Sequence, residues 1–397
     1  MKPGNLLILT YWSFDNALIQ TYTLPYLLQI RKIIPAQNKI YLFTFSQNQS
    51  FNPSTLAQIS RLKEQNIFLI EFRYQKFGVW MMFKLLFVFA YLIYLCVAKN
   101  IKYLHGWCTP GGALGYLLSV VTGKTLILDS FEPHAETMAE SGTWSRSGLA
   151  YKVLFALEKR QLKKAKEVIC AARGMIRHSQ EIYGITKNRY FVKPACVDLK
   201  LFDPLVPSKH TEFNLRSNVC VYAGKFGGIY LEQEVFDFFK AAHEHWKGDF
   251  TVLLLTSHSD QEIETYCTAS GFPPSALIKL FVSHQEVPAY MKLGTFGFCP
   301  VKPLPSKEFC TPIKNGEYWA MGLPVVITNN ISSDSALIEQ HKIGYVLKHL
   351  RAEEYSNALH ALDALKKDPQ LTERIRKIAV ETRSFEISNA IYRTIYG

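Results

Sequence analysis

The chain has 397 residues, with 45 lysines and arginines against 33 aspartates and glutamates, so its formal net charge is +12. Apolar residues make up 48% of the chain and charged residues 20%, which excludes a disordered polymer and a protein with many membrane spans. The length predicts two or three domains. The positive charge favours a negatively charged partner, which could be a nucleotide, a nucleic acid or an anionic membrane surface.

The eight cysteines are spread through segments that read as strands and helices, and no two form a Cys-x-x-Cys pair. This pattern predicts buried, reduced thiols in a cytoplasmic protein, and neither a disulfide framework nor a zinc site. The apolar run Leu6–Leu9 is too short for the core of a signal peptide and fits a first buried strand.

Short apolar runs alternate with helical stretches along the whole chain, and they are apolar throughout, which is typical of strands buried on both faces of a parallel sheet. The predicted strands of the first half are Leu6–Thr10, Lys39–Phe45, Ile67–Phe72, Ile101–His105, Leu126–Asp129, Glu167–Ala171 and Tyr190–Val192. Those of the second half are Asn218–Ala223, Phe250–Thr256, Leu277–Phe281, Phe296–Pro300, Pro324–Ile327 and Gly344–Leu347.

The stretch Leu199–Arg216 interrupts this alternation with two prolines and mixed charge, which indicates a linker. The sequence therefore predicts an α/β protein of two doubly wound, Rossmann-like domains that face each other across a cleft. We place the first domain at residues 1–205 and the second at residues 206–383. A C-terminal helix at about residues 384–397 is expected to pack back on the first domain.

One segment, Val79–Ala98, has the length of a membrane span and a single charge, Lys84. A span there would separate earlier strands from later strands that should join the same sheet, so we expect a buried or interfacial helix instead. The preceding residues 72–77 mix cations with aromatic rings, which fits either a membrane-surface patch or a solvated loop.

The most informative stretch is Cys310–Thr328, in which Pro312 and Ile313 lead into a short predicted helix that ends before Gly322. A loop followed by a helix N-terminus favours a bound phosphate, because free N–H groups point at the ligand. Lys314 and Glu317 are three residues apart on one face of this helix. They fit a site for a phosphate and a ribose, or an ordinary surface Lys–Glu pair.

In its Lys-x-x-Glu-Tyr-x-Ala-x-Gly-x-Pro-Val pattern this stretch resembles the retaining glycosyltransferases of the GT-B fold, in particular glycosyltransferase family 4. The matches Leu157–Ile169, Val192–Phe202 and Val221–Lys225 follow in the expected order, so the resemblance spans roughly residues 100 to 350. It implies that Glu317 binds the donor ribose. It also implies that Lys225 and Lys314 meet the donor diphosphate.

Two further parts of the donor site follow from the loops at strand ends. Gly227 and Gly228 would let backbone N–H groups approach the diphosphate closely. His134 follows the predicted strand Leu126–Asp129, and the resemblance implies that it contacts the donor sugar and helps catalysis, although a loop histidine packed on aromatic rings is the alternative. The resemblance thus gives the catalytic set His134, Lys225 and Glu317.

On the acceptor side we place Trp12, Ser13 and, as a weaker candidate, His105, because all three lie at strand ends. We expect no metal site. His243 and His245 are two apart on a predicted helix and cannot face one ion.

The departures from the family pattern matter as much as the matches. Phe309 stands where the family has a glutamate, Tyr230 where it has a basic residue, and Tyr11–Asn16 where it has a Gly-Gly turn. These changes indicate an uncommon donor sugar or altered catalysis.

The resemblance implies an enzyme that transfers a sugar from a nucleotide-diphosphate donor to a hydroxyl acceptor with retention, in cell-surface polysaccharide or glycolipid biosynthesis, without a metal or other cofactor. An epimerase or hydrolase of nucleotide sugars with the same fold is one alternative. A non-catalytic subunit that binds nucleotide sugars is another, suggested by Phe309 and Tyr230.

The expected partners are the nucleotide-sugar donor and a glycan, lipid-linked or small-molecule acceptor. A lipid-linked glycan is preferred because of the resemblance and the apolar segment 79–98. Arg73, Lys76 and Lys84 around that segment fit an anionic membrane surface better than nucleic acid, since no basic–aromatic nucleic-acid motif is present. We therefore expect a cytoplasmic protein, either free or peripheral on the inner face of the membrane.

Overall fold

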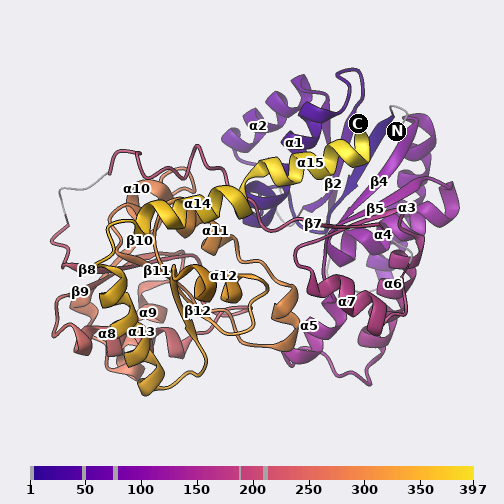
Figure 1. The fold of residues 1–397 in the computed structure, drawn as a ribbon. Coiled ribbons are helices and arrows are strands. Elements are labelled where there is room, and N and C mark those ends of the chain that lie inside the picture. Colours follow the sequence, from indigo (N-terminus) through magenta and orange to yellow (C-terminus); the bar gives the residue numbers. More distant parts are fainter. Residues whose placement is uncertain (1–3, 47–50, 75–78, 187–188, 209–212) are drawn as a thin grey trace. The chain divides into compact units, whose positions relative to one another are not determined.

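The computed structural model describes residues 4–46, 51–74, 79–186, 189–208 and 213–397. The chain forms two compact units (Figure 1). The first comprises Met1–Pro194 and Phe385–Gly397, and the second Ala195–Ser384. The first boundary thus falls before the predicted one at residue 205, ahead of the proline-containing stretch that we read as the linker.

The first unit is built on a seven-stranded sheet of parallel strand pairs, with the order β3-β2-β1-β4-β5-β6-β7. Its strands are β1 Asn5–Leu9, β2 Ile40–Ser46, β3 Ile67–Arg73, β4 Ile101–Trp107, β5 Thr125–Phe131, β6 Glu167–Cys170 and β7 Arg189–Val192. Its helices are η1 Ile19–Thr23, α1 Leu24–Ile33, α2 Pro53–Glu64, α3 Val79–Ala98, α4 Cys108–Thr122, α5 His134–Glu140, α6 Leu149–Lys164, α7 Gly174–Glu181 and α15 Phe385–Tyr396. Helix α15, at the end of the chain, lies alongside α1 (Figure 1).

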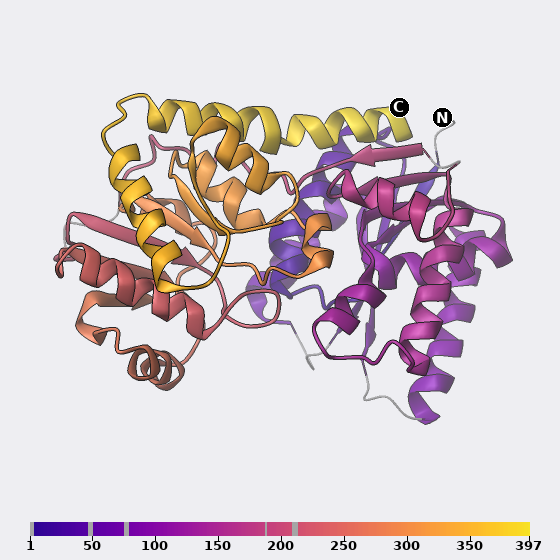
Figure 2. The same cartoon turned by 60° about the horizontal axis from the view of Figure 1, so that its bottom comes forward.

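The second unit has a six-stranded parallel sheet with the order β10-β9-β8-β11-β12-β13. Its strands are β8 Asn218–Ala223, β9 Phe250–Leu255, β10 Leu277–Leu280, β11 Phe296–Cys299, β12 Val325–Thr328 and β13 Gly344–Leu347. Its helices are α8 Gln233–His245, α9 Asp260–Ser270, η2 Pro274–Ala276, α10 Val287–Met291, η3 Pro305–Phe309, α11 Ile313–Ala320, α12 Asp334–His341, α13 Ala352–Leu365 and α14 Leu371–Arg383. They cover both faces of the sheet (Figure 2).

The alternation of side chains along β8 divides the interior of the second unit into two cores. Val219 and Val221 face one core, which includes Trp319 of α11, while Cys220 and Tyr222 face the other. Successive residues of a strand point to opposite faces, so a run that is apolar at every position needs a layer of helices on each side. This is why the uninterrupted apolar runs predict a doubly wound sheet correctly.

The predicted strands all occur, each within a few residues of its predicted bounds. The clearest difference is α5, because the sequence reads as a loop around His134 and the structure begins a helix there. The C-terminal helix predicted at about residues 384–397 is found as α15, which begins at Phe385, directly after α14 ends at Arg383. None of the eight cysteines, all of which lie within the described residues, forms a disulfide, and six of them are buried.

Helix α3 buries a narrow stripe and exposes the rest. Val88, Leu92 and Leu95 are buried, and their spacing of three to four residues places them on one face. Apolar side chains on its other faces are exposed, and they include Trp80, Phe83, Leu86, Phe87, Tyr94 and Val97. Among the helices that the structure describes, none combines the length and the hydropathy needed to cross a membrane. Lys76, one of the three cations that we expect around this segment, lies outside the described residues.

A buried polar network ties α15 to the carboxyl end of β5. Lys193 Nζ lies 2.6 Å from Asp129 Oδ1, and the Tyr392 hydroxyl donates a 2.8 Å hydrogen bond to Asp129 Oδ2. Although burial alone raises the pKa of Asp129, Lys193 and His105 lower it below its ordinary value. Buried charges require such partners, so we expect this network to hold the C-terminal helix in place.

Tyr392→Phe is expected to lower the free energy of unfolding by about 1–2 kcal/mol, because Asp129 keeps its charge and loses a buried hydrogen bond. Urea unfolding followed by circular dichroism measures the change. Tyr94→Phe on the exposed side of α3 is the matched control and should leave the unfolding midpoint unchanged. Equal midpoints for Tyr392→Phe and wild type would contradict the role of the network.

Candidate functional site

The candidate site of the second unit lies where its strand order reverses. Strand β8 pairs with β9 on one side and β11 on the other, so the connections that follow β8 and β11 leave in opposite directions. Such a reversal opens a crevice at the carboxyl ends of the strands, where α/β proteins bind ligands. Gly224 follows β8 at this point, and an isolated bridge pairs Tyr230 with Val301 just beyond β11.

Lys314 is the central residue of this crevice. It lies in the first turn of α11, its side chain is buried, and it extends over Gly224, where a Cβ atom would come within 2.8 Å of Lys314 Cε. Gly224 also has a φ of +126°, so only glycine suits this position. The ammonium lies 3.6 Å from the centre of the Tyr230 ring and 4.2 Å from that of Tyr222.

The environment of Lys314 favours an anion. Its Nζ atom is buried and has no hydrogen-bond partner within the described parts of the chain. Burial lowers the pKa of this lysine to about 8, so it still carries a charge at neutral pH. The aromatic rings stabilise the ammonium only in part. The N-terminus of α11 adds its own partial positive charge, and Pro312 and Ile313 form that terminus.

The loop after β8 contains two glycines with left-handed backbone conformations and a second lysine. Gly227 and Gly228 have φ angles of +77° and +61°, a left-handed pair of the kind that forms backbone cavities for anions. Lys225, just before them, is exposed, and its carbonyl accepts a hydrogen bond from the Tyr222 hydroxyl. On the other side of the loop, the Phe226 N–H donates a 2.9 Å hydrogen bond to His258 Nε2. The loop is thus held by its neighbours while its lysine faces solvent.

Glu317 lies one turn after Lys314, as predicted, and it is buried. Its Oε1 atom lies 2.8 Å from Nε2 of His284, which follows β10. Burial lowers the pKa of His284, but the hydrogen bond and the charge of Glu317 outweigh this and raise it above its ordinary value. His284 therefore orients the Glu317 carboxylate at the carboxyl edge of the sheet.

Both departures from the family pattern have a place in the structure. Tyr230 packs its ring against the Lys314 ammonium, so an aromatic face stabilises one cation where the family would add another. Phe309 ends the short helix η3 and is partly buried, and Glu308 precedes it on the same turn. The crevice therefore contains fewer charged groups than the family pattern implies.

His134 belongs to the first unit, where it is the first residue of α5. Its Nδ1 atom lies 3.6 Å from Glu132 Oε1, and its side chain is 30% exposed, so it remains accessible. The next residue, Ala135, donates its backbone N–H to Glu158 Oε1 at 2.9 Å. Burial raises the pKa of Glu158 to about 7, against the effect of the hydrogen bonds from Ala135 and Tyr183. Glu158 thus fixes the turn that presents His134.

The three residues that we predict on the acceptor side differ in their burial and in their hydrogen bonds. Trp12 is partly buried after β1, and the hydroxyl of buried Ser13 is hydrogen-bonded to Asp15. His105 has no exposed surface, with Nε2 at 3.1 Å from Asp129 Oδ2 and Nδ1 at 2.5 Å from the Tyr396 hydroxyl. This placement is that of a core histidine, and it does not favour contact with an acceptor.

The structure thus brings Lys314, Glu317, Tyr230 and the Gly224 turn together in one unit, and it places His134, Trp12 and Ser13 in the other. Sequence reasoning missed His284 and Glu158. His284 could have been found, because it lies in a loop after a predicted strand of the second sheet. Glu158 could not, because it acts through a backbone contact 23 residues away in the chain.

No family model matches this chain, and no curated protein matches it. Solved structures match over nearly its whole length. WaaG, a glycosyltransferase involved in lipopolysaccharide biosynthesis, is 14% identical, with a TM-score of 0.72 over 99% of each chain. Anabaena HepE in complex with UDP is also 14% identical, with a TM-score of 0.72 over 98% of this chain and 99% of that one.

A third similar structure is the sucrose-phosphate synthase of Thermosynechococcus elongatus, which is 14% identical, with a TM-score of 0.71 over 100% of this chain and 98% of that one. Together with the two doubly wound sheets, these likenesses show that the chain has the GT-B fold. The prediction of the fold class is confirmed.

Proposed function

We propose that this protein is a retaining glycosyltransferase that transfers a sugar from a nucleotide-diphosphate donor to a hydroxyl acceptor. The observation that carries the proposal is the Lys314 ammonium, which is buried, lacks a hydrogen-bond partner within the described residues and lies at the start of α11. A bound diphosphate would supply the missing acceptor oxygens. Glycosyltransferases are among the proteins of the same fold, and one structure of this fold holds UDP, which supports the choice of ligand.

Each site residue has a role in this reaction. Lys314, the Gly227–Gly228 turn and exposed Lys225 would neutralise the departing diphosphate. Glu317, oriented by His284, would accept hydrogen bonds from the ribose hydroxyls. His134 would hydrogen-bond the donor sugar and stabilise charge that develops at its reacting carbon. Fixed cations and backbone N–H groups would serve as the counter-charge, so we propose a donor site that works without a metal or other cofactor.

Saturation-transfer NMR with a panel of UDP and GDP sugars tests donor binding, and donor consumption with and without acceptors tests the reaction. Donor turnover that depends on an acceptor supports a transferase. Turnover without any acceptor would instead indicate the epimerase or hydrolase, and binding without turnover the non-catalytic subunit. No binding of any nucleotide sugar would contradict all three.

Lys225→Ala and Glu317→Ala are expected to weaken UDP or GDP binding by about tenfold each, because each removes a charge-assisted hydrogen bond worth about 1.5 kcal/mol or more. Calorimetric titration measures the affinity. Glu339→Ala, which removes an exposed carboxylate of α12, is the control and should bind as wild type does. If both site variants bind nucleotides as tightly as wild type, the site assignment is wrong.

The acceptor that we propose is a lipid-linked glycan of surface polysaccharide or glycolipid assembly. An apolar groove of about 740 Å³ runs between α3 and α4 of the first unit, and Tyr11, Phe45, Leu86, Phe89, Leu117 and Val121 are among its lining residues. The groove reaches Thr10 and Tyr11, which follow β1 at the carboxyl edge of the sheet. A lipid chain could lie in it with its glycan at that edge.

The same face would meet a membrane. Helix α3, which lines the groove, also has exposed apolar side chains, while Arg73 is the last residue of β3 and Lys84 lies in the first half of α3. Cations beside apolar side chains are typical of a surface that binds anionic lipids. We propose that the protein acts in the cytoplasm at the inner face of a membrane. Assays with matched soluble and lipid-linked acceptors test the choice, and equal rates with both would contradict it.

A further inference from the structure

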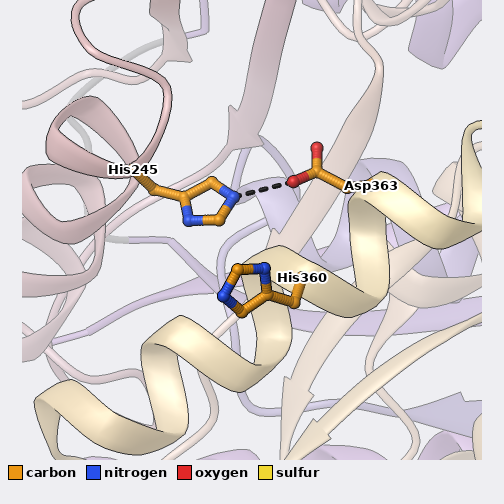
Figure 3. A group of neighbouring side chains, drawn as sticks. All are labelled: His245, His360 and Asp363. Carbon is orange, nitrogen blue, oxygen red and sulfur yellow. Dashed lines mark hydrogen bonds and ion pairs between the residues drawn. The ribbon is translucent and has the colours of Figure 1, made fainter.

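A group of three side chains outside the candidate donor site has the composition of a metal site. His245 at the end of α8 meets His360 and Asp363 of α13 (Figure 3). Each can offer one ligand atom, and these atoms all lie within 4.8 Å of one another. Figure 3 shows the His245 ring pointing at the Asp363 carboxylate, with the His360 ring beside them.

Helix geometry explains why the three converge. His360 and Asp363 are three residues apart on α13, so they lie on the same face of that helix. Helices α8 and α13 pack on each other, which brings His245 to that face. The centres of the His245 and His360 rings are 4.7 Å apart, and the ring planes meet at 79°. The three ligand atoms therefore converge on one small region, within 4.8 Å of one another.

Two further features hold the carboxylate and favour a cation. Trp246 Nε1 donates a 2.9 Å hydrogen bond to Asp363 Oδ1, while Oδ2 lies 2.7 Å from His245 Nε2. His245 also ends α8, and the free carbonyl groups at a helix C-terminus carry a partial negative charge.

We propose that His245, His360 and Asp363 form a binding site for a zinc-class divalent cation. Two imidazoles and one carboxylate, with water as a fourth ligand, are a set that Zn²⁺ accepts in tetrahedral geometry. The ion would take the place of the hydrogen bond between His245 Nε2 and Asp363, with the ring proton of His245 carried on Nδ1. Trp246 would keep the carboxylate oriented through its other oxygen, as outer partners of metal ligands do.

The position of the site indicates a structural role. In a doubly wound unit each helix returns from the carboxyl edge of the sheet to its amino edge, so the ends of α8 and α13 lie at the amino edge. Lys314 and Glu317 lie at the opposite, carboxyl edge. The ion would therefore clamp α8 to α13 across one core of the second unit, and would take no part in sugar transfer. The proposal departs from the expectation that the chain has no metal site. The dismissal of a His243–His245 pair stands, because the other ligands come from α13.

The purified full-length protein, stripped with a chelator, tests the proposal by calorimetric titration with ZnCl₂ and by absorbance with CoCl₂. We expect one ion per chain, a cobalt spectrum in the visible range typical of tetrahedral ligation, and a rise in Tm with zinc. His360→Ala removes an exposed ligand and leaves the His245–Asp363 hydrogen bond intact, so it should fold as wild type does without metal. It should bind zinc at least about 10-fold more weakly, because even the loss of an outer partner of a metal ligand costs about 10–100-fold in affinity.

His349→Ala, another exposed histidine of the same unit, is the matched control and should keep the wild-type affinity. Asp363→Asn is a second ligand variant and should lose the affinity in the same way. Wild-type affinity in both ligand variants would overturn the proposal, as would the lack of saturable zinc binding by the wild-type protein up to about 1 mM. UDP affinity should be the same with and without zinc, which separates this site from the donor site.

Discussion

Lys314→Met is expected to weaken nucleotide-diphosphate binding by about 10–150-fold, because a hydrogen bond from a charged group contributes about 1.5–3 kcal/mol. The loss should be similar for UDP and GDP, since the lysine would contact the diphosphate and not the base. Methionine retains the length of the side chain and fills the space over Gly224. Calorimetric titration of wild type and variant with each nucleotide measures the effect.

The same substitution should stabilise the folded protein. Burial lowers the pKa of Lys314 from 10.5 to about 8, so folding at neutral pH forces a charge into an apolar setting. Between pH 8 and pH 10.5 the unfolded chain binds more protons than the folded one, so the stability of the wild type should rise with pH in this window. At pH 7 the variant should be more stable by roughly 3 kcal/mol, because each pKa unit corresponds to about 1.4 kcal/mol.

The affinity of the wild type for UDP should depend on pH in the opposite direction. Only the protonated lysine attracts the diphosphate, so binding should weaken as the pH rises above about 8. Lys314→Met should show no such decline. Lys348→Met, which removes an exposed lysine paired with Glu339, is the control for both measurements. A variant that binds UDP normally, or that is less stable than wild type at pH 7, would show that Lys314 is an ordinary packing residue.

The sequence predicts the fold well because the signal that defines it is local. Each strand of the two sheets is a short apolar run, and the pattern of burial on both faces follows from the absence of polar alternation. Helix α5 was not predicted, because the contact that holds its first turn comes from another helix and not from its own residues. It is seven residues long, it begins after Pro133, and its first turn is held by the Glu158 carboxylate from α6.

For a similar reason, the sequence predicts only part of the candidate site. Lys314 and Glu317 stand out because both lie in one short motif, where helix spacing places them on one face. The partners that define their chemistry come from elsewhere in the chain. Tyr230 packs on Lys314 and His284 orients Glu317, and neither contact can be read from spacing. His245 meets α13 more than a hundred residues later, so its neighbourhood depends on tertiary packing alone.

His134→Ala is expected to lower kcat by about 10²–10³-fold, the usual cost of removing a positioned hydrogen-bond donor that stabilises charge in the transition state. The Kd for UDP should not change, because the proposed contact of His134 is with the sugar. Its backbone is held independently by Glu158, so the substitution should leave α5 in place. Turnover of the donor sugar and titration with UDP measure the two quantities separately.

His349→Ala, an exposed histidine of the second unit, is the control and should retain full activity. Glu158→Gln refines the test, because it keeps a group that can accept the Ala135 N–H but replaces the carboxyl whose pKa burial raises to about 7. If Glu158 only positions the turn, this variant should lose far less activity than His134→Ala, and its rate should follow the same pH profile as wild type.

Full activity in His134→Ala would remove this histidine from the mechanism. A loss of UDP affinity with kcat unchanged would instead place it among the residues that bind the nucleotide, because an interaction made equally in the ground state and the transition state lowers Kd without accelerating the chemical step.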